Sequence, residues 1–117
     1  MRLVSFDIDG TMDFGDPPGP ITVDMVHAAK DAGWVIGSAS DRTRADQQNR
    51  WDERDVPVDF VAHKHHLPEV RQRFEADTRV HIGDTDTDRY YALQAGFAFY
   101  WMDEAIELFI RETFGWE

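Results

Sequence analysis

The chain of 117 residues carries 23 acidic and 12 basic side chains, a net charge of −11, and no cysteine. Its length predicts a single domain over residues 1–117, and 42% hydrophobic with 13% aromatic residues excludes a disordered chain. The charge disfavours nucleic acid and anionic membranes as partners, and the lack of cysteine excludes disulfides and is typical of a cytoplasmic protein.

Short apolar runs alternate with amphipathic segments along the chain. The first run, at 3–6, predicts a buried strand, and we expect no secretory leader before it. Further strands are expected at 34–40, 58–63, 79–83 and 97–101, and helices at 21–33, 42–55, 67–77, 89–96 and 103–114. No run is long enough to span a membrane, and 13–20, with three prolines and two glycines, is predicted to be a loop. This alternation predicts an α/β fold, a three-layer α/β/α sandwich with a doubly wound, five-stranded parallel sheet.

In such a sheet, ligands bind beyond the carboxyl ends of the strands, and polar residues gather there in this sequence. Asp7 and Asp9 follow the first strand and, at spacing i, i+2, leave an extended chain on the same side. Polar groups also follow the next three strands, at Ser40–Arg42, His63–His66 and Gly83–Asp88. Two adjacent carboxylates are unfavourable unless a metal, a proton or a phosphoryl substrate offsets their repulsion, so we expect a site here.

The segment after the fourth strand carries three alternating aspartates, Asp84, Asp86 and Asp88. A calcium-binding loop begins in the same way, but it requires glycine at its sixth position and glutamate at its twelfth. Arg89 and Ala95 occupy those positions, so we exclude a calcium loop. Asp86 or Asp88 can also cap the following helix, and Asp88 can do this in addition to a role in the site.

At these residues the sequence resembles the haloacid dehalogenase-like (HAD) phosphohydrolases, over roughly residues 2–101. Their first motif, D-x-D-G-T, matches 7–11, and their fourth, G-D-x-x-x-D, matches Gly83–Asp88, each after the expected strand. Ser40, at the end of the second strand, is the candidate for the second motif, and Lys64, after the third strand, for the third. The resemblance implies a phosphatase that acts on a phosphate monoester of unknown identity.

The resemblance also implies a role for each matched residue. Asp7 is expected to be the nucleophile, passing through an aspartyl-phosphate, and Asp9 the general acid and base. Mg²⁺ is expected to bind Asp7, the backbone carbonyl of Asp9 and Asp84, while Asp88 orients a metal-bound water or Asp84 itself. The residues expected to hold the phosphoryl group are Thr11, Ser40, Arg42 and Lys64.

Some of these assignments have alternatives. Ser38 is an alternative to Ser40, which we prefer because it ends the apolar run and forms an S-x-R pattern with Arg42. Arg42 is either a phosphate or substrate contact or an arginine on a helix surface. Lys64 lacks the proline that often follows the lysine of the family, and its alternative is an ordinary surface lysine.

Histidines and aromatic residues offer further candidates. His63, His65 and His66 suggest zinc, but adjacent histidines rarely face one ion and no cysteine assists, so we expect substrate or loop roles for them. Trp34, Trp51 and the run 97–101 are expected in the core rather than in a ligand platform.

The spacing of the motifs leaves no room for a cap domain. Only 28 residues lie between Thr11 and Ser40, and 23 between Ser40 and Lys64. A capless site takes either a large substrate, such as a phosphorylated polymer end, or a small one enclosed by a neighbouring subunit in a homo-oligomer. The loop 13–20, which contains Phe14, is a candidate lid. The alternatives to a phosphatase are a catalytically silent metal- or phosphate-binding module, a polynucleotide end phosphatase and a phosphomutase, which usually needs a cap.

Overall fold

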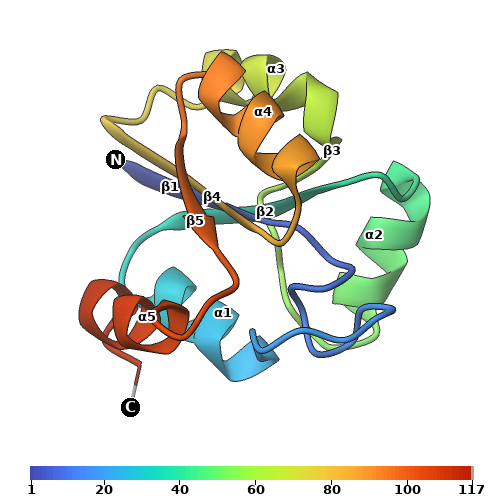
Figure 1. The fold of residues 1–117 in the computed structure, drawn as a ribbon, viewed down its shortest axis with the longest axis vertical. Coiled ribbons are helices and arrows are strands. Elements are labelled where there is room, and N and C mark those ends of the chain that lie inside the picture. The colour runs from blue at the N-terminus through green and yellow to red at the C-terminus, as the bar shows by residue number, and fades with distance from the viewer. Residues whose placement is uncertain (117) are drawn as a thin grey trace.

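A wholly parallel, five-stranded sheet forms the middle layer of the protein in the computed structural model, which describes residues 1–116 (Figure 1). The strands are β1 (Arg2–Phe6), β2 (Val35–Ser40), β3 (Phe60–His63), β4 (Thr78–Gly83) and β5 (Ala98–Trp101). Their spatial order is β3-β2-β1-β4-β5, so the chain first winds outward from β1 on one side and then on the other. The change of direction lies between β1 and β4, the position at which doubly wound sheets open a crevice for ligands.

Helices cover both faces of the sheet, as the three-layer prediction requires. They are α1 (Val23–Asp31), α2 (Arg44–Asp52), α3 (Leu67–Arg73), α4 (Asp86–Gln94) and α5 (Ile106–Phe114), with a short 3₁₀ turn η1 (Lys64–His66) before α3. In Figure 1, α3 and α4 lie above the sheet, while α1 and α5 lie below it. The predicted α/β architecture with a five-stranded parallel sheet is therefore confirmed.

Two apolar clusters join these layers, one on each face of the sheet. Along β1, Val4 and Phe6 belong to the cluster shared with α1, α2 and α5, while Leu3 belongs to the cluster shared with α3 and α4. This division follows from the strand period of two, which sends successive side chains to opposite faces. The predicted apolar face of the first helix is confirmed by the burial of Met25, Val26 and Ala29.

Helix boundaries differ from the predictions where capping decides them. The predicted helix 89–96 is wrong at both ends, because α4 begins at Asp86 and stops at Gln94. Thr85 is its N-cap, and its hydroxyl accepts from the backbone N–H of Asp88, whose carboxylate accepts from the backbone N–H of Thr85. The other predicted helices are each shortened by a few residues, at one or both ends.

The burial of the aromatic residues separates central from edge positions. Trp34, Trp51 and Phe97 are buried, as predicted. Along β5, however, Ala98 is exposed, Phe99 is only partly buried, and Tyr100 and Trp101 are each 38% exposed, so the prediction of a buried run at 97–101 is wrong after Phe97. The reason is that β5 lies at the edge of the sheet, where one side of the strand has no neighbour.

The loop that follows β1 is folded against the body of the protein. A bridge between Met12 and Ile21 closes it, and the ring of Phe14 packs edge-on against Trp51 with ring centroids 5.1 Å apart. The guanidinium of Arg54 covers the Phe14 ring at 4.2 Å. The candidate lid is therefore anchored on α2 through its aromatic residue. None of the helices in the described part of the chain has the length and apolar character of a membrane span.

Candidate functional site

The carboxyl ends of four neighbouring strands surround one cavity of about 230 Å³. Its lining residues, contributed by the segments that follow β1, β2, β3 and β4, are Asp7, Asp9, Pro17, Ser40, Asp41, Lys64, Asp84 and Thr85. The polar residues that the sequence places after separate strands therefore meet at one edge of the sheet. This edge lies at the change of winding direction, because β1 and β4 are neighbours there.

Asp7 is the innermost carboxylate of this cavity. Its backbone N–H extends the sheet by donating to Ile82 at 2.9 Å, and its side chain is 4% exposed. The ammonium of Lys64 lies 3.4 Å from Asp7 Oδ2. Burial, followed by the negative charge of Asp88, raises the pKa of Asp7 to about 9, although Lys64 acts in the opposite direction. Ionised Asp7 therefore needs more positive charge than Lys64 supplies.

Asp88 is fully buried and is held by donors on both of its oxygens. Oδ1 lies 2.8 Å from His81 Nε2 and 3.3 Å from the ammonium of Lys64. Oδ2 accepts from the hydroxyl of Thr85 at 2.7 Å and from its backbone N–H at 3.2 Å. Burial opposes ionisation, but the hydrogen bond and charge of His81, with Lys64 and Thr85, hold the pKa of Asp88 well below its usual range. These four donors fill the acceptor sites of the carboxylate, so Asp88 serves best as an anchor.

His81 extends this network into the core. Its Nδ1 lies 2.9 Å from the hydroxyl of Ser5, and both side chains are fully buried. An ionised carboxylate only accepts, so His81 Nε2 donates to Asp88. Sequence reasoning missed both residues. The available sequence signal was a serine among the apolar residues of β1 and a histidine among those of β4. No spacing rule connects two such residues on different strands.

Asp84 projects from the end of β4 onto the turn that follows Asp7. Gly10 has a φ of +74°, and a Cβ at this position would overlap the carboxylate of Asp84. Only glycine suits both the backbone conformation and the space. Asp84 Oδ1 is buried without a hydrogen-bond partner in the described part of the chain.

Oxygen atoms from three carboxylates, two that line the cavity and the buried Asp88, lie close together. One oxygen each of Asp7, Asp84 and Asp88 lies within 4.8 Å of the other two. We call these three residues, together with Lys64, the acidic set. Hard divalent cations such as Mg²⁺ prefer oxygen ligands of this kind. Asp84 Oδ1, which lacks a partner, and Asp7, with its raised pKa, are the two groups that a cation would satisfy.

Asp9 lies at the rim of the cavity and is held by Arg42. The guanidinium donates to both carboxylate oxygens, with Nη2 2.9 Å from Oδ1 and Nε 3.0 Å from Oδ2, and the backbone N–H of Asp16 donates to Oδ1 at 2.8 Å. Desolvation opposes the effect, but the hydrogen bond from Arg42 and the one from Asp16 lower the pKa of Asp9. Arg42 also contacts Asp46, and the hydrogen bond to Asp9, against an opposing effect of burial, raises the pKa of Arg42. The side chain of Asp9 is thus ionised and directed to Arg42.

The two serines of β2 have different surroundings. Ser40 lines the cavity, and its hydroxyl accepts from the backbone N–H of Arg42 at 3.1 Å. Ser38 is buried in the core, where it donates to Gln47 at 2.7 Å and accepts from Trp51 at 2.9 Å. Thr11 is also buried, and its hydroxyl has no hydrogen-bond partner in the described part of the chain. Of the four predicted phosphate ligands, the cavity is lined by Ser40 and Lys64 but not by Thr11 or Arg42.

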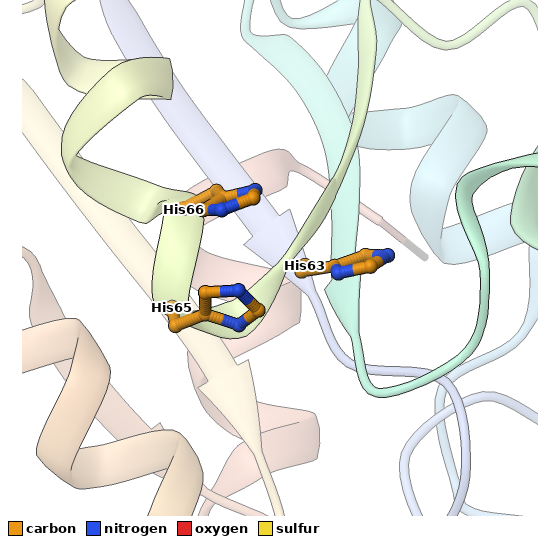
Figure 2. Close-up of side chains that lie close together, drawn as sticks. All are labelled: His63, His65 and His66. Carbon is orange, nitrogen blue, oxygen red and sulfur yellow. The ribbon is translucent and has the colours of Figure 1, made fainter.

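Next to Lys64 of the acidic set, the turn from β3 to α3 carries three histidines whose rings lie close together (Figure 2). We call His63, His65 and His66 the histidine cluster. One ring nitrogen from each lies within 4.8 Å of the other two. The adjacent His65 and His66 rings have centroids only 4.1 Å apart, against the expectation that neighbours in the chain point apart.

Comparisons of this chain with protein-family models, with curated proteins and with solved structures found no match. The residues of the cavity and their geometry are therefore the basis for assigning a function. Asp7 and Asp84 offer oxygen atoms suited to a cation, and Ser40 and Lys64 offer donors suited to an anion.

Proposed function

We propose that this protein is a capless, Mg²⁺-dependent phosphatase of the HAD-like type, which hydrolyses a phosphate monoester through an aspartyl-phosphate on Asp7. The observation that carries the proposal is the convergence of Asp7, Ser40, Lys64 and Asp84 on one cavity at the carboxyl ends of four strands. This is the order of groups that the D-x-D-G-T and G-D-x-x-x-D motifs imply. Phosphoryl transfer requires a nucleophile, a cation and donors for the phosphoryl oxygens, and these residues offer the nucleophile, ligands that would hold the cation, and the donors.

Asp7 is the group best placed to attack a phosphorus atom. Its carboxylate is inside the cavity, and its backbone is held in register with β4 by the hydrogen bond to Ile82. The ammonium of Lys64 and the hydroxyl of Ser40 lie on the same cavity wall and can donate to phosphoryl oxygens. Attack forms the bond between Asp7 Oδ and phosphorus and breaks the bond from phosphorus to the leaving oxygen. Water then hydrolyses the acyl phosphate and regenerates Asp7.

The residues that would hold Mg²⁺ are Asp7, Asp84 and the backbone carbonyl of Asp9. Bound there, the ion would offset the negative charge shared by Asp7 and the phosphoryl group. Asp88 has no free acceptor position, so its role is to orient Lys64, which it contacts at 3.3 Å. His81 and Ser5 hold Asp88 in turn, so a buried chain of contacts connects the core of the sheet to the phosphate site.

Asp9 is assigned to proton transfer, and Arg42 controls when it is available. As general acid, Asp9 must take up a proton and leave the guanidinium that now holds both of its oxygens. A substrate whose anionic group attracts Arg42 would free Asp9 for this step. Arg42 is therefore proposed as a substrate-sensing contact rather than as a phosphate ligand.

The open cavity restricts what it can enclose. A volume of about 230 Å³ suits a phosphoryl group, and the rest of the substrate must lie outside or against a neighbouring subunit. The anchoring of Phe14 on α2 makes the loop 13–20 a fixed wall of the cavity, to which Pro17 contributes. This arrangement favours a substrate recognised mainly by its phosphate group and by surface contacts.

One observation supports a second candidate function. The ion pair between Asp9 and Arg42 removes the general acid from use, which suits a module that binds a cation and phosphate without turnover. Such a module would keep the acidic set and Lys64 but would leave the phosphate ester intact.

A phosphate-release assay separates the two functions. The purified protein is incubated with a panel of phosphate monoesters and Mg²⁺, and the peptide containing Asp7 is analysed by mass spectrometry for one added phosphoryl group. Release of phosphate that needs Mg²⁺ and is absent in Asp7→Asn supports the phosphatase. Binding of phosphate with no release from any ester supports the silent module.

A further inference from the structure

The histidine cluster lies at a turn where, among the described residues, its side chains have no polar partner. His63 occupies the N-cap position of η1 and His66 that of α3, yet neither side chain makes a capping hydrogen bond. Within residues 1–116, no hydrogen bond or ion pair involves any of the three rings. Residues at these positions usually satisfy the free backbone N–H groups of the helix, so this geometry is not explained by local capping.

The rings nevertheless lie close together and face one another. The ring centroid of His63 lies 5.4 Å from that of His65 and 5.6 Å from that of His66, and the planes of His63 and His66 are parallel to within 3°. Figure 2 shows the three rings close together at the turn, and one ring nitrogen of each lies within 4.8 Å of the other two. His65 is exposed and the other two are half-buried, so an ion can reach them from solvent.

We propose that the histidine cluster binds a borderline divalent transition-metal ion of the Zn²⁺ class, with water completing its coordination. Neutral imidazole nitrogen is the ligand that zinc, copper and nickel share, and three protein ligands with one open position form a recurring zinc arrangement. A tetrahedral ion with bonds of about 2.0–2.1 Å needs ligand nitrogens roughly 3.4 Å apart. The present upper limit of 4.8 Å is within the reach of small side-chain rotations.

This site is chemically distinct from the acidic set and does not depend on the proposed phosphatase activity. Oxygen ligands favour a hard cation, whereas the imidazoles favour a borderline one. Lys64, a member of the acidic set, lies between His63 and His65 in the chain, and its ammonium lies 3.4 Å from Asp7 and 3.3 Å from Asp88. An ion on His63, His65 and His66 would hold the backbone on both sides of Lys64. It would therefore act as a clamp that fixes this lysine in place.

A calorimetric titration with Zn²⁺, in saturating Mg²⁺ and with the full chain, tests the proposal. We expect one ion per chain, and an affinity reduced by more than about tenfold in His65→Gln and in His66→Gln, because even the loss of an outer partner of a ligand costs roughly that much. His27→Gln on α1 and Asp84→Asn in the acidic set are the controls, and both should keep the wild-type zinc affinity. Titration with Co²⁺ should give a ligand-field absorption band that His65→Gln removes.

Two results would overturn this site. Equal zinc affinities in the wild type and His65→Gln would show that the cluster is not the ligand set. Loss of zinc binding in Asp84→Asn with full binding in His65→Gln would place the ion in the acidic set. Circular dichroism in EDTA verifies that each variant is folded, and the exposed position of His65 makes its substitution the most readily tolerated.

Discussion

The acidic set and the histidine cluster are neighbours that are built in opposite ways. The carboxylates come from residues up to 81 positions apart, Asp7 and Asp88, and both side chains are buried. The histidines come from four consecutive positions, 63–66, and the described structure gives their rings no hydrogen bond or ion pair. Lys64, in the middle of the histidine cluster, belongs by its contacts to the acidic set.

The comparison shows what burial and partners contribute to a site. In the acidic set, desolvation and the charge of Asp88 raise the pKa of Asp7, whereas the donors around Asp88 overcome desolvation and lower its pKa, so the two carboxylates differ before any ligand arrives. The histidine cluster has the ligand atoms but no surrounding network, so a bound ion would set its final geometry. The first kind of site is suited to chemistry, and the second to capture of an ion.

Substitution of the proposed nucleophile is expected to have the largest effect on activity. It tests whether the chemistry belongs to the acidic set. Asp7→Asn should lower Mg²⁺-dependent phosphate release by at least about a thousandfold, because the attacking oxygen is lost. Asp13→Asn, an exposed aspartate on the following loop, is the matched control and should keep full activity. Steady-state phosphate release with an aryl phosphate measures the effect. Normal turnover in Asp7→Asn would end the proposed mechanism.

A pair of histidine substitutions compares how much a buried and an exposed histidine contribute to stability. His81→Leu should lower the free energy of unfolding by about 2–3 kcal/mol, because Asp88 and Ser5 lose a buried partner. His65→Leu should change it by less than about 0.5 kcal/mol, because the exposed His65 ring makes no hydrogen bond or ion pair within residues 1–116. Urea unfolding in EDTA measures both. Similar losses in the two variants would show that the histidine cluster has structural partners after all.

The pH dependence of stability tests the raised pKa of Asp7. Its folded pKa of about 9 lies above the ordinary value of 3.8, so the folded state holds a proton that the unfolded state releases. In metal-free protein this group therefore contributes stability that is present at low pH and is lost as pH rises from about 4 to 9. Asp7→Asn removes this loss and should be more stable than wild type at pH 8 by about 1 kcal/mol or more.

The measurement is urea unfolding in EDTA at pH 5 and at pH 8. Asp13→Asn should retain the wild-type difference between the two pH values. An unchanged difference in Asp7→Asn would mean that the buried carboxyl is already compensated without a cation.

Release of Asp9 from Arg42 provides the next test. Hydrogen bonds from Arg42 help to lower the pKa of Asp9, so Arg42→Gln should raise it toward its ordinary value. The pH above which the general acid is lost should then move upward in the profile of kcat for an alkyl phosphate. An aryl phosphate with a good leaving group should show a smaller shift, because it needs less proton donation. Identical shifts for both substrates would argue against Asp9 as the acid.

Salt is expected to have the smallest effect on stability. A comparison of KCl with MgCl₂ distinguishes the screening of surface charge from the binding of an ion. Molar KCl should raise the Tm by a few degrees, roughly 2–5 °C, because it weakens repulsion in a chain of net charge −11. MgCl₂ at matched ionic strength should raise the Tm further by binding the native state. The extra rise should vanish in Asp84→Asn, whose Oδ1 has no partner within residues 1–116. A Tm that falls with KCl would contradict the repulsion argument.

The alternation of apolar and amphipathic segments determined the fold class. Strand and helix periods are local properties, and parallel strands joined by helices have few arrangements. The polar residues that follow each strand in the sequence also indicated which side chains line the cavity. The carboxyl ends of parallel strands all lie at the same end of the sheet, so residues that follow different strands meet there. Asp7, Ser40, Lys64 and Asp84 were identified in this way. Ser40 rather than Ser38 lines the cavity for a local reason, because Ser40 ends the strand.

Long-range contacts were decided by the tertiary structure alone. Arg42 reaches Asp9 across 33 positions, and Ser5 meets His81 across 76, distances over which no sequence period operates. The exposure of Tyr100 and Trp101 depends on the place of β5 at the edge of the sheet, which the strand order sets. The histidine cluster is the reverse case: its members are adjacent in sequence, yet only the 3₁₀ turn η1 brings neighbouring rings onto one side. Sequence determines which groups are present at each strand end, whereas backbone path and packing determine which of them meet.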